Sequence, residues 1–174
     1  FYTEPELLER LFDKLLEAYI RLKDYCDSRL GVKSTSLGLA DDNSAFISAE
    51  MYRKFVAPRN KALFDRYGSK WRTLHADGPN DHLFGIIADY LKVNVMDIGG
   101  FSSMEAALAA MKGKTVIEGN INNRDIYGAF DDTAKAKVRH MIKAAAPGGG
   151  YVFAVGGEAY VGAPPETMIE MVEY

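Results

Sequence analysis

The sequence has little of what marks several large classes of protein. Its 174 residues include one cysteine, Cys26, which excludes an internal disulfide and fits a reducing, cytoplasmic setting. Cys26 itself is expected to be a small buried residue of a helix. No apolar run approaches the roughly 20 residues needed to span a bilayer, so we expect no membrane partner. The formal charge is −3, and no basic stripe alternates with aromatic residues, which argues against a nucleic-acid partner.

The chain also lacks the features of a protein start. Residues 1–5 have no charged segment followed by an apolar one, so they are not a secretory signal, and there is no initial Met. A helical pattern begins at once and extends to residue 29. We therefore expect a part of a longer protein, with residues 1–174 as one partial domain that is long enough to build a core.

What the sequence does contain is a repeated pairing of a short apolar run with a helical pattern. Parallel strands that are buried on both faces read as such short apolar runs. The runs are residues 32–40, 71–74, 93–98, 114–118 and 151–155. Their spacing of roughly 20 to 40 residues is that of strand–helix units. The pattern predicts an α/β fold of about five such units, which is either part of an eight-stranded barrel or an open doubly wound sheet.

Polar residues follow these runs, where the strands are expected to end. Ligand sites in parallel sheets gather at the carboxyl ends of the strands, so we expect one shared pocket. The candidates are Asp42, His75, Asp77, Asp97, Asn120 and Glu158. His75 and Asp77 are the candidate catalytic pair, because an imidazole and a carboxylate can carry protons or position water. The other four are candidate substrate ligands.

Each candidate also has a purely structural interpretation. Asp42 suits a turn, and Asp77 suits a helix cap. Asp97 ends a buried run, and a buried carboxylate is costly alone, so it requires either a ligand or an internal donor. Asn120 suits a turn as well as a ligand contact, and Glu158 suits a solvated loop.

Four segments resemble the uroporphyrinogen decarboxylase superfamily, which comprises porphyrinogen decarboxylases and methyltransferases that act on corrinoid proteins. The segments are residues 47–55 (ISAEMYRKF), 75–80 (HADGPN), 118–122 (EGNIN) and 150–166. Proteins of this superfamily are (β/α)8 TIM barrels. The resemblance therefore implies a partial TIM barrel of about five βα units, which corresponds to the C-terminal portion of the family. The first strands, which carry an arginine-rich substrate motif in the decarboxylases, have no counterpart in this chain.

The resemblance also bears on a metal site. Zinc-dependent methyltransferases of the family have a His-x-Cys segment and a later Cys, and these positions correspond to His75, Asp77 and Gly157 in this sequence. Catalytic zinc usually has three protein ligands, and thiolates favour zinc, so the resemblance implies that zinc is not bound at these positions. A set of His75, Asp77 and Glu158 is the remaining alternative for a metal, and it requires a rearranged loop.

The function implied by the resemblance is transfer of a methyl group between a corrinoid, carried by a partner protein, and a small carrier molecule. A pocket rich in Asp and Asn without thiolates suits a pterin such as tetrahydrofolate, whose N–H groups need acceptors. A porphyrinogen decarboxylase is the alternative enzyme, weakened because Gly157 replaces the histidine of that branch. The third interpretation is a non-catalytic partial barrel that is completed by another copy or by a complementary N-terminal fragment.

Overall fold

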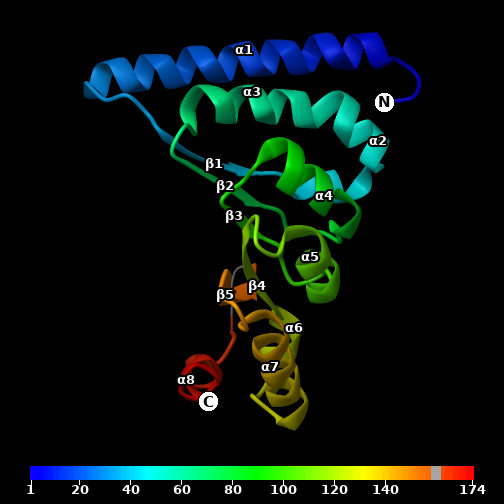
Figure 1. The fold of residues 1–174 in the computed structure, drawn as a ribbon, viewed down its shortest axis with the longest axis vertical. Helices are drawn as coiled ribbons and strands as arrows, with labels where there is room; N and C mark the ends of the chain where they lie inside the picture. The colour runs from blue at the N-terminus through cyan, green and yellow to red at the C-terminus, as the bar shows by residue number, and fades with distance from the viewer. Residues whose placement is uncertain (158–161) are drawn as a thin grey trace.

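Five parallel strands form one sheet in the computed structural model, which describes residues 1–157 and 162–174 (Figure 1). The strands are β1 (Ser36–Ala40), β2 (Trp71–His75), β3 (Val95–Asp97), β4 (Val116–Asn122) and β5 (Tyr151–Gly156). Their spatial order is also their order along the chain, and all neighbouring pairs are parallel. A doubly wound sheet reverses its winding at a switch point, whereas a barrel does not. The open-sheet alternative is therefore wrong, and the partial TIM barrel is confirmed.

Helical segments connect the strands and cover one side of the sheet. They are α1 (Pro5–Leu30), η1 (Asp42–Phe46), α2 (Ala49–Met51), η2 (Tyr52–Val56), α3 (Ala57–Tyr67), η3 (Asp81–Leu83), α4 (Phe84–Ile86), η4 (Ile87–Leu91), α5 (Met104–Met111), α6 (Asn123–Ile126), α7 (Asp132–Ala145) and α8 (Pro165–Glu173). α3, α4, α5 and α7 follow one another along the sheet, and α1 lies against α3 near β1 (Figure 1). Among the described residues, no helix has both the length and the apolar character that crossing a membrane requires.

Local sequence explains where several of these helices begin. The side chains of Ser48, Ser103 and Asp131 accept hydrogen bonds from free backbone N–H groups at the starts of α2, α5 and α7. Pro58 lies where the π-helical segment η2 passes directly into α3, and because proline has no N–H it makes no backbone hydrogen bond to the preceding turn there. Gly31 follows the last turn of α1 in a left-handed conformation that favours glycine.

The two faces of the sheet differ in chemistry because side chains alternate along each strand. Leu74, Met96 and Ile117 are register neighbours on β2, β3 and β4, and they are almost fully buried against the helices. The next residues along the same strands form a polar row on the opposite face, namely His75, Asp97 and Glu118. This opposite face is the barrel interior, so the fold presents a row of titratable groups there.

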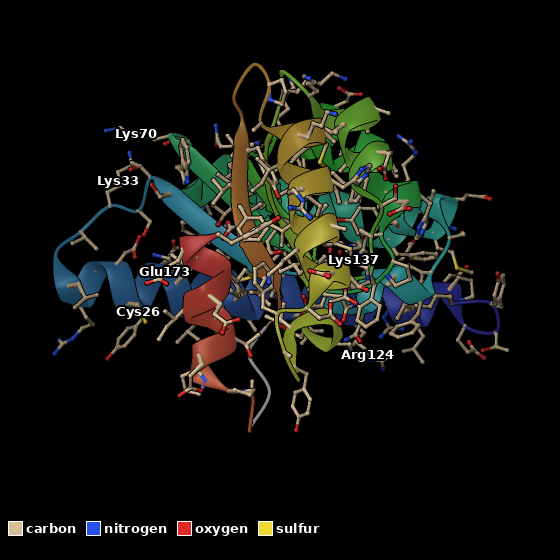
Figure 2. The ribbon with its side chains drawn as sticks, turned by 90° about the horizontal axis from the view of Figure 1, so that it is seen from below. Cys26, Lys33, Lys70, Arg124, Lys137 and Glu173 are labelled. Carbon is tan, nitrogen blue, oxygen red and sulfur yellow. The ribbon has the colours of Figure 1, made fainter. Side chains whose placement is uncertain are left out.

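Different basic residues lie at the amino ends and at the carboxyl ends of the strands. Lys33 and Lys70, which precede β1 and β2, lie near one another at the amino ends, whereas Arg124, which follows β4, lies at the carboxyl ends (Figure 2). Four of the residues predicted for the site lie at the carboxyl ends as well, because His75 and Asp97 end β2 and β3, and Asp42 and Asp77 follow β1 and β2.

Three features differ from the sequence predictions. β1 begins at Ser36, not at residue 32, because Val32 is exposed and outside the ladder with β2. β4 extends to Asn122, not to residue 118, because β5 pairs with it up to that residue. Cys26 is exposed, not buried, because α1 packs on α3 along one side and has no buried residue of its own.

Candidate functional site

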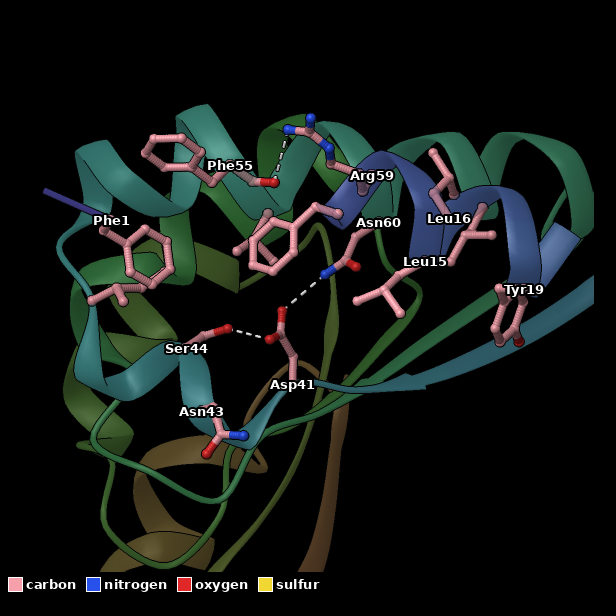
Figure 3. Close-up of a pocket in the computed structure, with 14 residues that line it drawn as sticks. Phe1, Leu15, Leu16, Tyr19, Asp41, Asn43, Ser44, Phe55, Arg59 and Asn60 are labelled. Atoms are coloured by element: carbon pink, nitrogen blue, oxygen red, sulfur yellow. Dashed lines mark hydrogen bonds between the residues drawn. The ribbon is translucent and has the colours of Figure 1, made fainter. Parts of the chain in front are cut away.

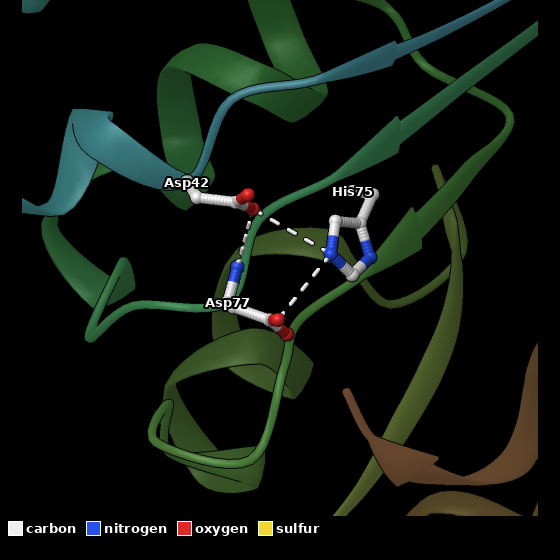
Figure 4. A group of neighbouring side chains, drawn as sticks. All are labelled: Asp42, His75 and Asp77. Carbon is white, nitrogen blue, oxygen red and sulfur yellow. Dashed lines mark hydrogen bonds and ion pairs between the residues drawn. The ribbon is translucent and has the colours of Figure 1, made fainter. Parts of the chain in front are cut away.

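Four polar side chains meet at the carboxyl ends of the first three strands. Asp42 lies two residues beyond β1, and Asp77 lies two residues beyond β2. His75 and Asp97 are the last residues of β2 and β3, and they are direct neighbours in the register of these strands. Figure 4 shows the side chains of Asp42, His75 and Asp77 converging from two neighbouring strands. The structure thus brings four of the six candidate residues into one cluster, which we call the Asp–His cluster.

His75 has carboxylates near both of its ring nitrogens. Nδ1 lies 2.7 Å from Asp97 Oδ2, and the other Asp97 oxygen accepts from the Gly99 N–H at 3.0 Å. Nε2 lies 3.5 Å from Asp42 Oδ1 and 3.5 Å from Asp77 Oδ2. Because Asp97 is an acceptor, Nδ1 carries the hydrogen of the neutral ring. The lone pair of Nε2 then faces the space between Asp42 and Asp77.

The charges around His75 oppose the effect of its burial. Partial burial lowers the pKa of the imidazole, whereas the hydrogen bond and charge of Asp97 and the charges of Asp77 and Asp42 raise it. The net result is a pKa above the usual value of a histidine. The imidazole of His75 therefore holds a proton more readily than an ordinary histidine does.

Glycines allow the loops after β2, β3 and β5 to meet at the cluster. Gly99 has a φ of 61°, and a Cβ atom there would lie 2.7 Å from Asp77 Cα. A Cβ atom on Gly156 would lie 2.1 Å from Gly100 N, so β5 contacts the loop after β3 through backbone alone. A Cβ atom on Gly157 would lie 3.3 Å from Asp77 Oδ2. Position 157 therefore borders the cluster but contributes no side chain.

The remaining two candidates are not part of the cluster as described. Asn120 lies inside β4, not at its end; it is 8% exposed, and its amide nitrogen donates to Ser102 O at 2.7 Å. The prediction that Asn120 follows a strand is wrong, because the ladder with β5 continues two residues further. Glu158 lies outside the described residues. The sequence predicts that Asp97 needs either a ligand or a hydrogen-bond donor from the protein. The structure supplies such donors to both carboxylate oxygens, namely His75 Nδ1 and the Gly99 N–H.

Glu118 is an interior residue that the sequence did not single out. It is the register neighbour of Asp97 on β4 and is partly exposed to the barrel interior. It also ends the predicted run of residues 114–118, just as His75 follows the run of residues 71–74 and Asp97 lies near the end of the run of residues 93–98. That shared position was the signal available in the sequence.

A separate cavity of about 450 Å³ lies between α1, η1 and α3 (Figure 3). Its lining is mostly apolar and includes Phe1, Phe12, Leu15, Leu16, Phe55 and Leu63. Asp41 borders this cavity and accepts from Tyr52 Oη at 3.0 Å, from Asn60 Nδ2 at 2.8 Å and from Ser44 Oγ. These bonds tie the end of β1 to the following helical segments. None of the residues of the Asp–His cluster lines the cavity.

Three residues of the cluster have the chemistry of metal ligands. Asp42, His75 and Asp77 each offer one ligand atom, and these atoms all lie within 4.8 Å of one another. The zinc ligands implied by the resemblance do not fit this chain, because Gly157 has no donor atom and a carboxylate replaces the thiolate at Asp77. Asp42, which the sequence marked as a substrate ligand, is the third donor in the described structure.

A parallel sheet in barrel order, with polar residues at the carboxyl ends of its strands, defines the class of TIM-barrel proteins. The family model of uroporphyrinogen decarboxylase (URO-D) matches residues 1–174, and the chain belongs to this family. A solved structure of a methyltransferase from Methanosarcina mazei is similar in fold, with a TM-score of 0.72 at 19% sequence identity. The match covers 99% of this chain and 50% of that one, so the chain spans about half the length of the M. mazei protein. No curated protein sequence matches the chain.

Proposed function

We propose that the complete protein is a methyltransferase that moves a methyl group between a corrinoid on a partner protein and tetrahydrofolate. The observation that supports this proposal is the Asp–His cluster, which offers several acceptors and no thiolate. The N–H groups of a pterin need acceptors, and one carboxylate can accept from two of them. The similarity in fold to the M. mazei methyltransferase is compatible with the same class of reaction.

The residues of the cluster have separate roles in this proposal. His75 and Asp77 are the catalytic residues, with His75 Nε2 exchanging a proton with the carrier or with a water that Asp77 positions. Asp97 fixes the orientation of the imidazole and is therefore a positioning residue. Asp42 and Glu158 are the proposed contacts to the carrier.

The charge of the cluster distinguishes this proposal from the decarboxylase alternative. A porphyrinogen substrate carries several carboxylates, and the three carboxylates around His75 would repel them at short range. Tetrahydrofolate also carries carboxylates, but they lie on its glutamate tail, away from the pterin ring whose N–H groups the cluster would bind. The cluster therefore favours methyl transfer over decarboxylation.

Calorimetry with methyltetrahydrofolate on the complete, EDTA-treated protein tests the proposal. The wild type should bind it in preference to a free thiol such as coenzyme M, and Asp42→Asn should weaken binding by roughly 1.5 to 3 kcal/mol, or about tenfold to hundredfold. Asp89→Asn is the matched control, because Asp89 is exposed and pairs with Lys114 at the other end of the strands. Failure of the wild type to bind, or equal binding by Asp42→Asn, would remove the pterin, and turnover of uroporphyrinogen would then establish the decarboxylase.

A further inference from the structure

We infer that Asn80 and Ser102, two buried residues outside the Asp–His cluster, are positioning residues that hold the carboxylate of Asp77 beside His75. Asn80 ends the segment of residues 75–80 (HADGPN), and Ser102 lies in the loop between β3 and α5. Asn80 is 0% exposed and Ser102 is 7% exposed, so neither side chain can bind a substrate itself.

The side chain of Asn80 closes the loop after β2 on itself. Its Nδ2 donates to Ala76 O at 3.2 Å and to Gly78 O at 2.9 Å. Both partners are carbonyl acceptors, so the amide nitrogen and not the amide oxygen must lie between them. Ala76 and Gly78 are the two chain neighbours of Asp77. A single side chain therefore fixes the backbone on both sides of Asp77.

Ser102 joins this loop to the sheet. Its Oγ donates to Gly78 O at 3.0 Å and accepts from the Asn80 N–H at 3.1 Å. The carbonyl oxygen of Ser102 accepts in turn from Asn120 Nδ2 at 2.7 Å, inside β4. A chain of buried hydrogen bonds thus runs from the interior of β4 through Ser102 to the neighbours of Asp77.

The position of the Asp77 carboxylate depends on this backbone. Its Oδ2 lies 3.5 Å from His75 Nε2, which is long for a hydrogen bond, so this contact by itself does not fix the side chain. The backbone, in contrast, is closely confined. The Asp77 N–H donates to Asp42 Oδ1 at 3.0 Å, and a Cβ atom on Gly99 would lie 2.7 Å from Asp77 Cα. Loosening the loop should therefore move the carboxylate away from Nε2.

Neither residue is explained by the start of a helix. Asn80 directly precedes η3, but its side chain does not cap that helix. α5 is capped by Ser103, whose Oγ accepts from the Ala106 N–H, so Ser102 is not needed for this purpose. Asn80 Oδ1 is also buried without a hydrogen-bond partner among residues 1–157 and 162–174, which destabilises the fold. The amide is thus kept at a cost, and the bonds that it makes are those to the neighbours of Asp77.

The inference rests on the proposed function only in the catalytic role given to Asp77. The position of Asp77 relative to His75 can be measured without any methyl carrier. Binding of methyltetrahydrofolate, in contrast, tests the proposed reaction. Failure of the positioning role and failure of the methyltransferase proposal are therefore distinguishable.

An NMR titration of His75 in the complete, EDTA-treated protein tests the positioning role, with the signal identified by its loss in His75→Gln. Asp77→Asn sets the scale: the pKa of His75 should fall, because the charge of Asp77 raises it. Ser102→Ala removes one oxygen and should produce part of the same fall, since the freed loop lets Asp77 move away. Ser103→Ala is the matched control in the same loop. It loses the cap of α5 but no bond to the loop of Asp77, so the His75 titration should not change.

A double substitution shows whether Ser102 acts through Asp77. In the Asp77→Asn background, Ser102→Ala should cause no further fall in the His75 pKa, because no charge remains to be displaced. Asn80→Ala should behave like Ser102→Ala, and circular dichroism shows whether each variant is folded. An unchanged His75 pKa in folded Ser102→Ala would overturn the inference. So would an equal fall in Ser103→Ala, or a fall that persists in the Asp77→Asn background.

Discussion

The chemistry available to the site depends on which nitrogen of His75 each carboxylate faces. Asp97 is its register neighbour and takes Nδ1, because parallel strands place the two side chains on the same face about 4.8 Å apart. Asp42 and Asp77 come from loops beyond the strand ends and reach Nε2 from the other side. One nitrogen is therefore used for positioning, and the other is left for a proton, a substrate or an ion.

Replacing Asp97 by Asn should lower the pKa of His75. The negative charge of Asp97 stabilises the imidazolium, and without it the lowering effect of burial is opposed only by the charges of Asp77 and Asp42. An NMR titration of the metal-free protein measures this shift. The chain has three histidines, so single Gln substitutions of the other two identify the His75 signal. Glu105→Gln, which removes a carboxylate near His140 instead, should leave the His75 titration unchanged. An identical His75 pKa in Asp97→Asn would contradict this account.

At the scale of elements, apolar runs located the strands but not all of their ends. Strands buried on both faces contain few polar interruptions, so their centres are visible in the sequence. The end of β4 is not visible, because Asn120 and Asn122 are polar residues held in the sheet by pairing with β5. Strand pairing is a contact between distant segments, and local sequence does not encode it. The local sequence therefore predicts a strand end at Asn120, which lies inside β4.

For the candidate site, too, the sequence predicts the location but not all of the detail. Asp42, His75, Asp77 and Asp97 follow runs whose ends were nearly right, so their meeting at one edge follows from the geometry of parallel strands. Which carboxylate faces which ring nitrogen of His75 could not be predicted. It depends on the rotation of the His75 ring and on glycine contacts between loops, which arise only when the loops pack together.

The contact between the end of β5 and the loop after β3 should be intolerant of any side chain. In Gly156→Ala the new Cβ atom would lie 2.1 Å from Gly100 N, and backbone must move to relieve the clash. We expect a loss of about 1 to 3 kcal/mol in the free energy of unfolding, measured by urea denaturation. Gly85→Ala is the matched control, because its Cβ atom meets nothing within 4 Å, and it should be neutral or stabilising by up to about 1 kcal/mol. Equal stability of the two variants would show that the loop contact is not rigid.

At the scale of the whole molecule, the sheet is an open arc. Among the described strands, β1 pairs with β2 alone and β5 with β4 alone, whereas a closed barrel of this class has eight strands. α1 adds an apolar face that no described element covers, formed by Leu7, Leu11, Leu22 and Tyr25. Unpaired strand edges and contiguous apolar surface both favour association with further chain.

The chain of 174 residues, expressed by itself, should therefore self-associate or bind a complementary fragment that carries the other strands of the barrel. The driving force is burial of the apolar face of α1 and pairing along the free edge of β1. Light scattering coupled to size exclusion, at micromolar concentration, measures the assembly. The double substitution Leu7→Lys and Leu11→Lys places charges on that face and should shift the chain towards monomer, whereas Lys135→Glu on α7, away from α1, should leave the assembly unchanged. A folded wild-type chain that stays monomeric across this concentration range would show that the exposed face and edge are stable without a partner.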